Sequence, residues 1–157
     1  MSDPSARQVE AARERASEVT VRGAGQGVAQ VISAGKHTWR ADEPVDKFGD
    51  DSGPAPIELL LSALGSCTAI TVRLYARHKG WPLEDLKVRL THRKVDAAEL
   101  PHLSDKQGRI DAIEREIELV GPLDGEQRAR LLEIANRCPI HRTLTGQIDI
   151  RTRLAGP

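Results

Sequence analysis

Aromatic side chains are scarce in this chain, and their scarcity limits both the core and the ligands it can bind. Tyrosine and phenylalanine occur once each and tryptophan twice, so aromatics make up 3% of 157 residues. The core must therefore consist of leucine, isoleucine, valine and alanine. A base-stacking platform for nucleic acid needs several aromatic rings on one surface. The composition therefore argues against an RNA-binding sheet of that type.

An excess of either charge is also missing. Lys+Arg and Asp+Glu both number 23, which gives no net charge at pH 7. Nothing in this balance draws the whole protein to phosphate backbones or anionic membranes. We therefore expect neither nucleic acid nor a membrane as a partner. Hydrophobic residues at 39% and charged residues at 29% are typical of one globular domain of this length.

The sequence shows no export signal. Residues 1–16 are polar and lack the apolar run of a signal peptide. The most apolar stretch, residues 57–74, contains Glu58 and Arg73 and is interrupted by Ser and Gly, which favours a buried helix over a membrane span. We expect a cytoplasmic protein with a flexible or helical tail over residues 1–16 and a single domain over residues 17–157.

Cysteine is nearly absent as well. Cys67 and Cys138 are the only two, and they lie 71 positions apart. The chain is therefore not a small secreted scaffold held together by disulfides. Two thiols in an intracellular protein are available for redox chemistry instead.

Apolar periodicity predicts an α+β fold. A long helix is expected from residue 57 to about residue 79, with Pro56 at its first position and Gly80 as its C-cap. Along the predicted strand around residues 113–119, Ile113, Arg115, Ile117 and Leu119 share one face and three glutamates share the other. The other predicted elements are strands near residues 19–22, 28–32, 37–41, 86–91 and 147–154, and helical segments over residues 123–136 and 139–144.

This order of elements, β-β-β-α-β-β-α-α-β, has no βαβ repeat and is typical of the α+β class with antiparallel sheets. The long helix is apolar on more than one face. One sheet and two further helices in a chain this small cannot cover it. We therefore expect an obligate homodimer.

Two segments resemble a known family. Residues 53–69, Gly-Pro-Ala-Pro-Ile-Glu-Leu-Leu-Leu-Ser-Ala-Leu-Gly-Ser-Cys-Thr-Ala, and residues 137–144, Arg-Cys-Pro-Ile-His-Arg-Thr-Leu, are similar to those of the OsmC/Ohr family of organic-hydroperoxide and osmotic-stress proteins. The resemblance extends over residues 18–154. It implies an intertwined α+β homodimer in which antiparallel sheets wrap around a long central helix. The two active sites are then expected at the subunit interface.

The resemblance also implies a function, thiol-dependent reduction of organic hydroperoxides in oxidative or osmotic stress. Cys67 would attack the peroxide, and Cys138 would resolve the resulting sulfenic acid to a disulfide. A dithiol reductant would recycle the pair. No metal or other cofactor is implied.

The two thiols differ in how the sequence prepares them for this chemistry. A peroxidatic cysteine must be a thiolate, which requires a nearby cation or a helix N-terminus. Cys138 precedes Pro139 and can cap a helix, which would lower the pKa of its thiol. Cys67 lies mid-helix, where desolvation raises the pKa unless an arginine approaches. The alternative for Cys67 is a small apolar core residue.

The chain departs from the family at the groups that would support Cys67. Members of the family use an arginine of the N-terminal sheet and a glutamate ten residues before the first cysteine, but here that position is Ile57. Glu58 lies half a helical rotation away from Cys67, so it would act through a break in the helix or from the partner subunit, or serve only as a first-turn carboxylate. Arg22 and Arg40 are both candidates for the arginine, with Arg22 slightly favoured. The remaining candidates to orient that arginine are Asp42 and Glu43.

Other chemistries are less favoured. Cys138 and His141 could form half of a metal site, with His37, His92 or His102 completing it, but a second paired motif is missing. His141 is then expected to orient or electrostatically support Cys138, or to cover a helix end. The absent glutamate leaves one further alternative, a non-catalytic protein that binds a small apolar ligand in the pocket of the same dimer.

Overall fold

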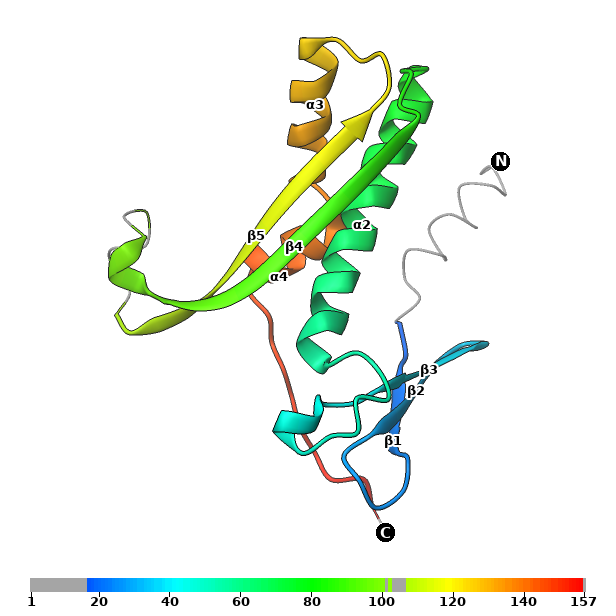
Figure 1. Ribbon diagram of the computed structural model, residues 1–157, viewed down its shortest axis with the longest axis vertical. Coiled ribbons are helices and arrows are strands. Elements are labelled where there is room, and N and C mark those ends of the chain that lie inside the picture. Colours follow the sequence, from blue (N-terminus) through cyan, green and yellow to red (C-terminus); the bar gives the residue numbers. More distant parts are fainter. Residues whose placement is uncertain (1–16, 101, 103–106, 157) are drawn as a thin grey trace, which may run out of the picture. The chain divides into compact units, whose positions relative to one another are not determined.

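The computed structural model describes residues 17–100, 102 and 107–156, so the predicted tail over residues 1–16 lies outside them. The fold is mixed α+β with antiparallel sheets and a long central helix, as expected (Figure 1). The elements are β1 (Thr20–Gly23), β2 (Gln30–Ala34), β3 (His37–Ala41), α2 (Pro56–Lys79), β4 (Asp85–Asp96), β5 (Arg109–Val120), α3 (Gly125–Ala135) and α4 (Pro139–Thr145), with single 3-10 turns at Val45–Lys47 and Ala97–Glu99. Two compact units, Met1–Leu59 and Leu60–Pro157, make up the chain.

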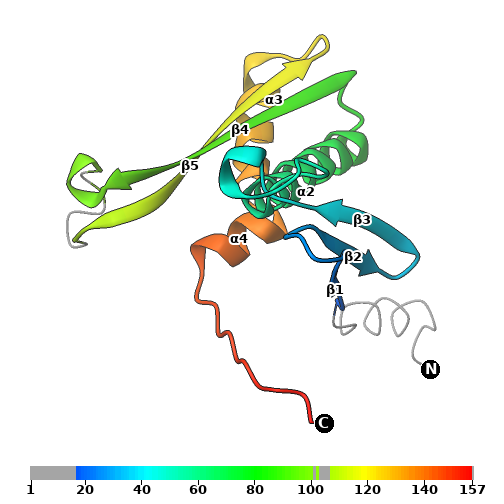
Figure 2. The same ribbon diagram turned by 60° about the horizontal axis from the view of Figure 1, so that its bottom comes forward.

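In the first unit, β1, β2 and β3 form an antiparallel sheet in chain order (Figure 2). Its register places Arg22 opposite Val31, and Val31 opposite Arg40. Directly opposed residues of a sheet point to the same face. Arg22 and Arg40 therefore share one face, with Val31 between them. Their backbones are separated by two strand spacings, about 10 Å.

The loop between β3 and α2 is organised by one buried carboxylate. Asp42 accepts hydrogen bonds from the backbone N–H groups of Glu43, Asp50 and Ser52 at 2.8, 3.2 and 3.1 Å, and from the Ser52 hydroxyl at 2.7 Å. The hydrogen bonds from Ser52 are the main reason that the pKa of Asp42 falls from 3.8 to about 2, helped by those from Glu43 and Asp50 and opposed by burial. The loop is thus tied to the end of β3.

Local sequence signals set the ends of α2. At the first turn, Glu58 Oε2 accepts a hydrogen bond from the backbone N–H of Ala55 at 2.8 Å, which satisfies a donor at the helix start. At the other end, Gly80 adopts a φ of 65°, and the N–H of Trp81 donates to the Ala76 carbonyl at 2.9 Å. A left-handed glycine with this bond is the usual helix C-terminus. The predicted bounds of the long helix are confirmed.

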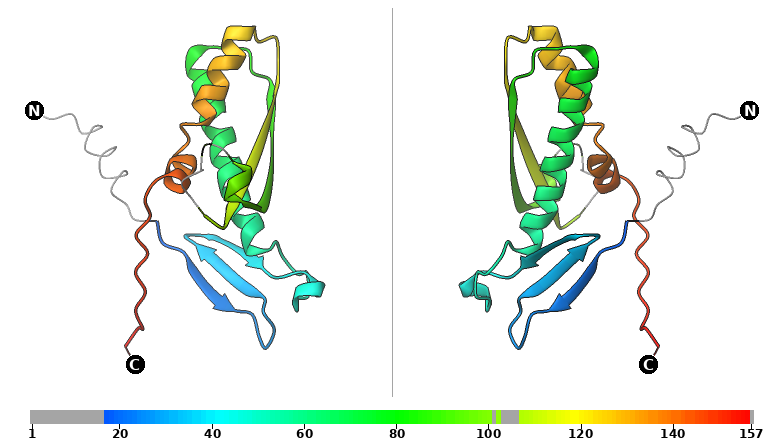
Figure 3. Two further views of the ribbon diagram at one scale, coloured as in Figure 1. Left: turned by 90° about the vertical axis from the view of Figure 1, so that its left-hand side faces the viewer. Right: turned by 90° about the vertical axis from the view of Figure 1, so that its right-hand side faces the viewer.

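The second unit is built on a two-stranded ribbon. β4 and β5 pair antiparallel along their full length, from Asp85 opposite Val120 to Asp96 opposite Arg109. Figure 3 shows α2 (green) and α3 (orange) on the same face of this ribbon. The core between them contains side chains of all four elements: Val72, Ala76, Leu86, Ile117, Leu119, Leu131 and Ala135.

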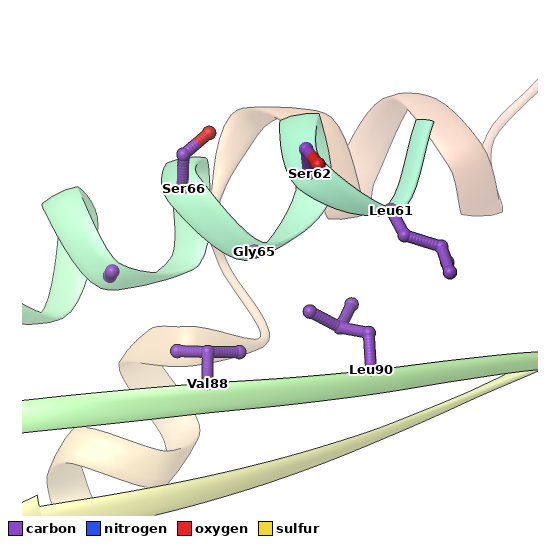
Figure 4. Close-up of a pocket in the computed structure, with 7 residues that line it drawn as sticks. Leu61, Ser62, Gly65, Ser66, Val88 and Leu90 are labelled. Atoms are coloured by element: carbon purple, nitrogen blue, oxygen red, sulfur yellow. The ribbon is translucent and has the colours of Figure 1, made fainter. Parts of the chain in front are cut away.

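α2 and β4 approach each other closely at Gly65. A Cβ on Gly65 would lie 2.8 Å from Leu90 Cδ1, so the end of the flexible Leu90 side chain would have to shift (Figure 4). The shallow groove beside this contact is lined by Leu61, Ser62, Gly65, Ser66, Ala69, Val88 and Leu90. None of these side chains is titratable, so we assign this groove no chemistry.

The prediction of a last strand over residues 147–154 was wrong for the single chain. These residues form no helix or strand, and Ile150 is 82% exposed. Their alternating pattern suits a strand, but a strand also needs a neighbour for its N–H and C=O groups. Among the described residues, no strand pairs with this segment.

Candidate functional site

The two cysteines meet at the start of α4. Cys67 is the twelfth of 24 residues of α2 and is half-buried, whereas Cys138 directly precedes α4 and is fully buried. The backbone N–H of Ile140 donates to Cys67 Sγ at 3.5 Å, and the next one, of His141, donates to Cys138 Sγ at 3.4 Å. Successive amides of one helical turn thus hold both sulfur atoms.

The sequence explains the position of Cys138. Its backbone is extended, with φ −62° and ψ 144°, and its Sγ accepts the hydrogen bond that an N-cap side chain usually accepts. Pro139 follows at the first helical position, where a missing N–H costs nothing. The prediction that Cys138 caps a helix is confirmed.

Arg115 of β5 provides the cation of this site. Its Nη1 donates to Thr68 Oγ1 at 2.8 Å and to the Ala135 carbonyl at 3.4 Å, and its Nη2 donates to Asn136 Oδ1 at 2.7 Å. Thr68 is fully buried, and its Oγ1 lies 3.6 Å from Cys138 Sγ. The guanidinium thus links β5, α2 and the end of α3 next to the second thiol.

The sequence reasoning assigned no role to Arg115 or Thr68. A signal for Arg115 was nevertheless available, because it occupies the apolar face of a strand, in step with Ile113 and Ile117. A charge at such a position must find partners inside the protein. Thr68 could not have been found in this way, since threonine is common in helices that carry core residues.

The surroundings shift the pKa values of the two thiols in opposite directions. Burial raises the pKa of Cys67, the N–H of Ile140 opposes this, and the neighbouring Cys138 adds to the increase. Burial also acts to raise the pKa of Cys138, but the N–H of His141, the Thr68 hydroxyl, Cys67 and the charge of Arg115 together outweigh it and lower the pKa. These directions agree with the expectation from the sequence.

A cavity of about 580 Å³ lies beside this cluster. Its polar lining consists of Arg93, His102, Asp111, Glu114, Arg115, Asn136, His141 and Thr145. Burial together with the charge of Arg115 lowers the pKa of His141, which favours a neutral imidazole. Its apolar side is formed by Leu64, Leu100, Ile110, Ile113, Leu132 and Leu144. A small molecule with an apolar body fits such a lining.

The candidate metal ligands do not gather. Within residues 17–100, 102 and 107–156, no three side chains of His, Cys, Asp or Glu lie together as a metal site. His92 pairs with Asp111, with its Nε2 2.8 Å from Oδ1.

The remaining predicted site residues belong to the first unit. Arg22 and Arg40 are exposed on the same sheet face, so the two candidates are neighbours there. Glu58 caps the start of α2, which agrees with the first-turn alternative. Asp42 uses both carboxylate oxygens in the loop, which argues against its orienting an arginine.

Comparisons with known proteins agree on the family. The family model described as OsmC-like protein matches residues 49–153. A comparison with curated proteins finds no match. Among solved structures, the chain is similar to OsmC of Legionella pneumophila, described as an organic hydroperoxide resistance protein, with 16% identity over 87% of this chain and 93% of that one and a TM-score of 0.61.

Two further structures show the same fold. The organic hydroperoxide resistance protein OhrB of Bacillus subtilis has 18% identity over 86% of this chain and 94% of that one, with a TM-score of 0.57. A Vibrio cholerae protein that is also described as an organic hydroperoxide resistance protein holds captopril in one of its active sites. It has 19% identity over 87% of this chain and 88% of that one, with a TM-score of 0.58. The matched residues 49–153 include both cysteines that meet at the start of α4. The chain belongs to the OsmC-like family.

Proposed function

We propose that this protein reduces organic hydroperoxides with the Cys67–Cys138 pair. The Cys67 thiolate attacks the terminal peroxide oxygen, the O–O bond breaks, and the alkoxide takes up a proton and leaves as the alcohol. Cys67 is oxidised to the sulfenic acid. The Cys138 thiolate then attacks Cys67 Sγ, the S–O bond breaks, and hydroxide leaves and is protonated to water. A dithiol reductant returns the disulfide to two thiols and is itself oxidised to a disulfide.

One observation carries this proposal, the placement of both sulfur atoms at successive N–H groups of α4. A sulfenic acid on Cys67 would form within reach of the second thiol, so resolution needs no large movement of the backbone. The apolar cavity of about 580 Å³ supports a substrate with an organic body in preference to hydrogen peroxide. The names of the similar Legionella and Bacillus proteins support the same activity.

The raised pKa of Cys67 requires a cation for the attacking thiolate. We propose that Arg22 or Arg40 supplies it, and that Glu58 of a second subunit or Glu43 orients it. We also propose that the protein is a homodimer. Ile70 and Leu74 on α2 are 58% and 59% exposed in the single chain, and a second subunit would cover them. We place this dimer in the cytoplasm, where thiol reductants are available.

A second candidate function is a non-catalytic protein that binds a small apolar ligand in the same cavity. It is favoured by Ile57, which occupies the position of the expected carboxylate and is 37% exposed. The similar Vibrio protein holds captopril in one of its active sites, so a small organic molecule can enter the site of that protein. The two candidates predict different behaviour of the thiols toward peroxide.

The test uses the reduced protein and one equivalent of cumene hydroperoxide without external thiol. Mass spectrometry is expected to show the loss of two hydrogens and a peptide pair joined through Cys67 and Cys138. In Cys138→Ser the product should be a sulfenic acid on Cys67 that dimedone traps. Two free thiols after this treatment would favour the ligand-binding candidate.

The arginines are tested by rate. Arg22→Ala or Arg40→Ala should slow peroxide consumption by about a hundredfold, the scale of losing one preorganised electrostatic partner. Arg73→Ala is the matched control, because Arg73 is exposed and pairs with Asp85 at 3.0 Å. Full activity in the double variant of Arg22 and Arg40 would contradict the role proposed for them.

A further inference from the structure

The guanidinium of Arg115 is held only by neutral groups. Its partners are the Thr68 hydroxyl, the Ala135 carbonyl and the Asn136 side-chain oxygen. In the part of the chain that the structure describes, no Asp or Glu lies within ion-pair distance of it. A half-buried cation without a carboxylate is stabilised by an anion nearby. The charge of Arg115 acts to lower the pKa of the Cys138 thiol and that of His141, and of these two groups only the thiol can become an anion.

Thr68 connects Arg115 to that thiol. Its Oγ1 accepts from Arg115, lies 2.7 Å from the Leu64 carbonyl, and lies 3.6 Å from Cys138 Sγ. The hydroxyl has one proton and can therefore donate to only one of the last two. With Cys138 as a thiol, the proton goes to Leu64 and the S–H donates to the oxygen. With Cys138 as a thiolate, the hydroxyl turns and donates to sulfur while Arg115 still donates to the oxygen.

We infer that Arg115, acting through Thr68, is a positioning residue that holds Cys138 as the thiolate of the pair. As a result, an external thiol that reduces the disulfide attacks Cys67. The inference rests on the proposed function for the redox role of the Cys67–Cys138 pair. The contacts that support it all lie within a single chain.

The chemistry follows from the stability of the leaving group. The reductant thiolate attacks Cys67 Sγ, the Cys67–Cys138 bond breaks, and the electron pair of that bond leaves on Cys138. The better stabilised thiolate leaves faster, and Cys67 is also the more exposed sulfur. The second thiol of the dithiol, as a thiolate, then attacks the reductant sulfur of the mixed disulfide, the bond to Cys67 Sγ breaks, and Cys67 leaves as a thiolate. The reductant ends as an intramolecular disulfide.

The groups that face Cys138 come from three elements. α2 contributes Cys67 and the neutral Thr68, β5 contributes Arg115, and α4 contributes His141. His141 is half-buried, and desolvation together with the charge of Arg115 lowers its pKa, so it adds no charge near neutral pH. Among the main influences on the Cys138 thiol, Arg115 is therefore the cation.

The first test measures the ionisation of Cys138 in a Cys67→Ser background, by the pH dependence of its alkylation with iodoacetamide. Arg115→Met and Thr68→Val should each raise the midpoint by about one pH unit. Thr68→Ser should restore it, and Arg89→Met, on the opposite face of the same ribbon, should leave it unchanged. Circular dichroism checks that each variant is folded. A midpoint that stays within about 0.3 unit in both Arg115→Met and Thr68→Val would overturn the inference.

The second test measures the direction of disulfide opening. Protein oxidised with diamide is treated with glutathione, quenched with N-ethylmaleimide and mapped by mass spectrometry. We expect glutathione on Cys67 and the maleimide on Cys138, with the preference falling several-fold in Arg115→Met. Glutathione mainly on Cys138, an unchanged preference in Arg115→Met, or no disulfide with diamide would overturn the inference. Because diamide replaces peroxide, a protein without peroxidase activity can still pass this test.

Discussion

Leu131 on α3 offers a sharp test of the packing that supports the site. Its side chain is 1% exposed and packs in the core with Val72 and Ala76 of α2. α3 also carries Ala135 and precedes Asn136, both of which hold Arg115. Leu131→Ala removes this contact and should loosen α3 from α2.

The magnitude follows from burial. Fully burying a leucine side chain contributes about 1.5–3 kcal/mol, and the cavity left by truncation adds to the loss. The facing residues belong to a long helix that cannot close on the gap, so we expect a loss of about 3 kcal/mol. The adjacent Leu132 is 56% exposed, so Leu132→Ala forfeits about half of the transfer free energy without a cavity and should cost about 1 kcal/mol.

Urea unfolding followed by far-ultraviolet circular dichroism measures both variants. Reductant keeps the thiols reduced, and one protein concentration is used throughout because a dimer makes stability concentration-dependent. With a slope of about 2 kcal/mol/M, Leu131→Ala should lower the midpoint by about 1.5 M. A loss below about 1 kcal/mol, or one no larger than that of Leu132→Ala, would refute the assigned packing.

Three further predictions concern other parts of the chain. Gly121→Ala should cost several kcal/mol in urea unfolding, because Gly121 has a φ of 134° and a Cβ would collide with the Pro82 carbonyl. Gly80→Ala, where φ is 65° but the space is open, should cost only about 1–2 kcal/mol; equal losses would contradict this. Because Asp42 has a folded pKa of about 2 against 3.8, its stabilisation should be lost as pH falls from about 4 to about 2. Asp42→Asn should flatten acid unfolding in that window, and an unchanged profile would argue against the loop contacts. Ile70→Lys should convert the proposed dimer to a 17.2 kDa monomer in analytical ultracentrifugation, whereas a monomeric unmodified protein would refute the proposed dimer.

Local signals made much of the fold predictable. Pro56 and Gly80 give the bounds of α2 because each fits a backbone conformation that a helix end requires. The N-cap position of Cys138 follows from Pro139 in the same way. The meeting of Cys67 with Cys138 was inferred from the family resemblance, since no local pattern relates residues so far apart.

Features that depend on distant partners were missed or misjudged. Arg115 acts on Cys138 through Thr68, and the three residues come from elements that only tertiary packing brings together. The alternation over residues 147–154 satisfied every local criterion for a strand, yet a strand forms only where another edge receives it. The sequence offered Arg22 and Arg40 as separate alternatives, whereas the sheet register places both on one face as neighbours.

With the proposed disulfide, the long span of sequence between Cys67 and Cys138 would link the redox state of the protein to its lifetime. A bond between them would close a loop of about 70 residues and restrict the unfolded chain, worth about 4 kcal/mol in the chain-entropy account. Because folding and disulfide formation are thermodynamically linked, the same ~4 kcal/mol would make the bond harder to reduce in the folded protein than in the unfolded chain, by a factor on the order of a thousand. Exposure to peroxide would then harden the protein against heat and proteases, and reducing conditions would return it to the form that cells degrade more readily.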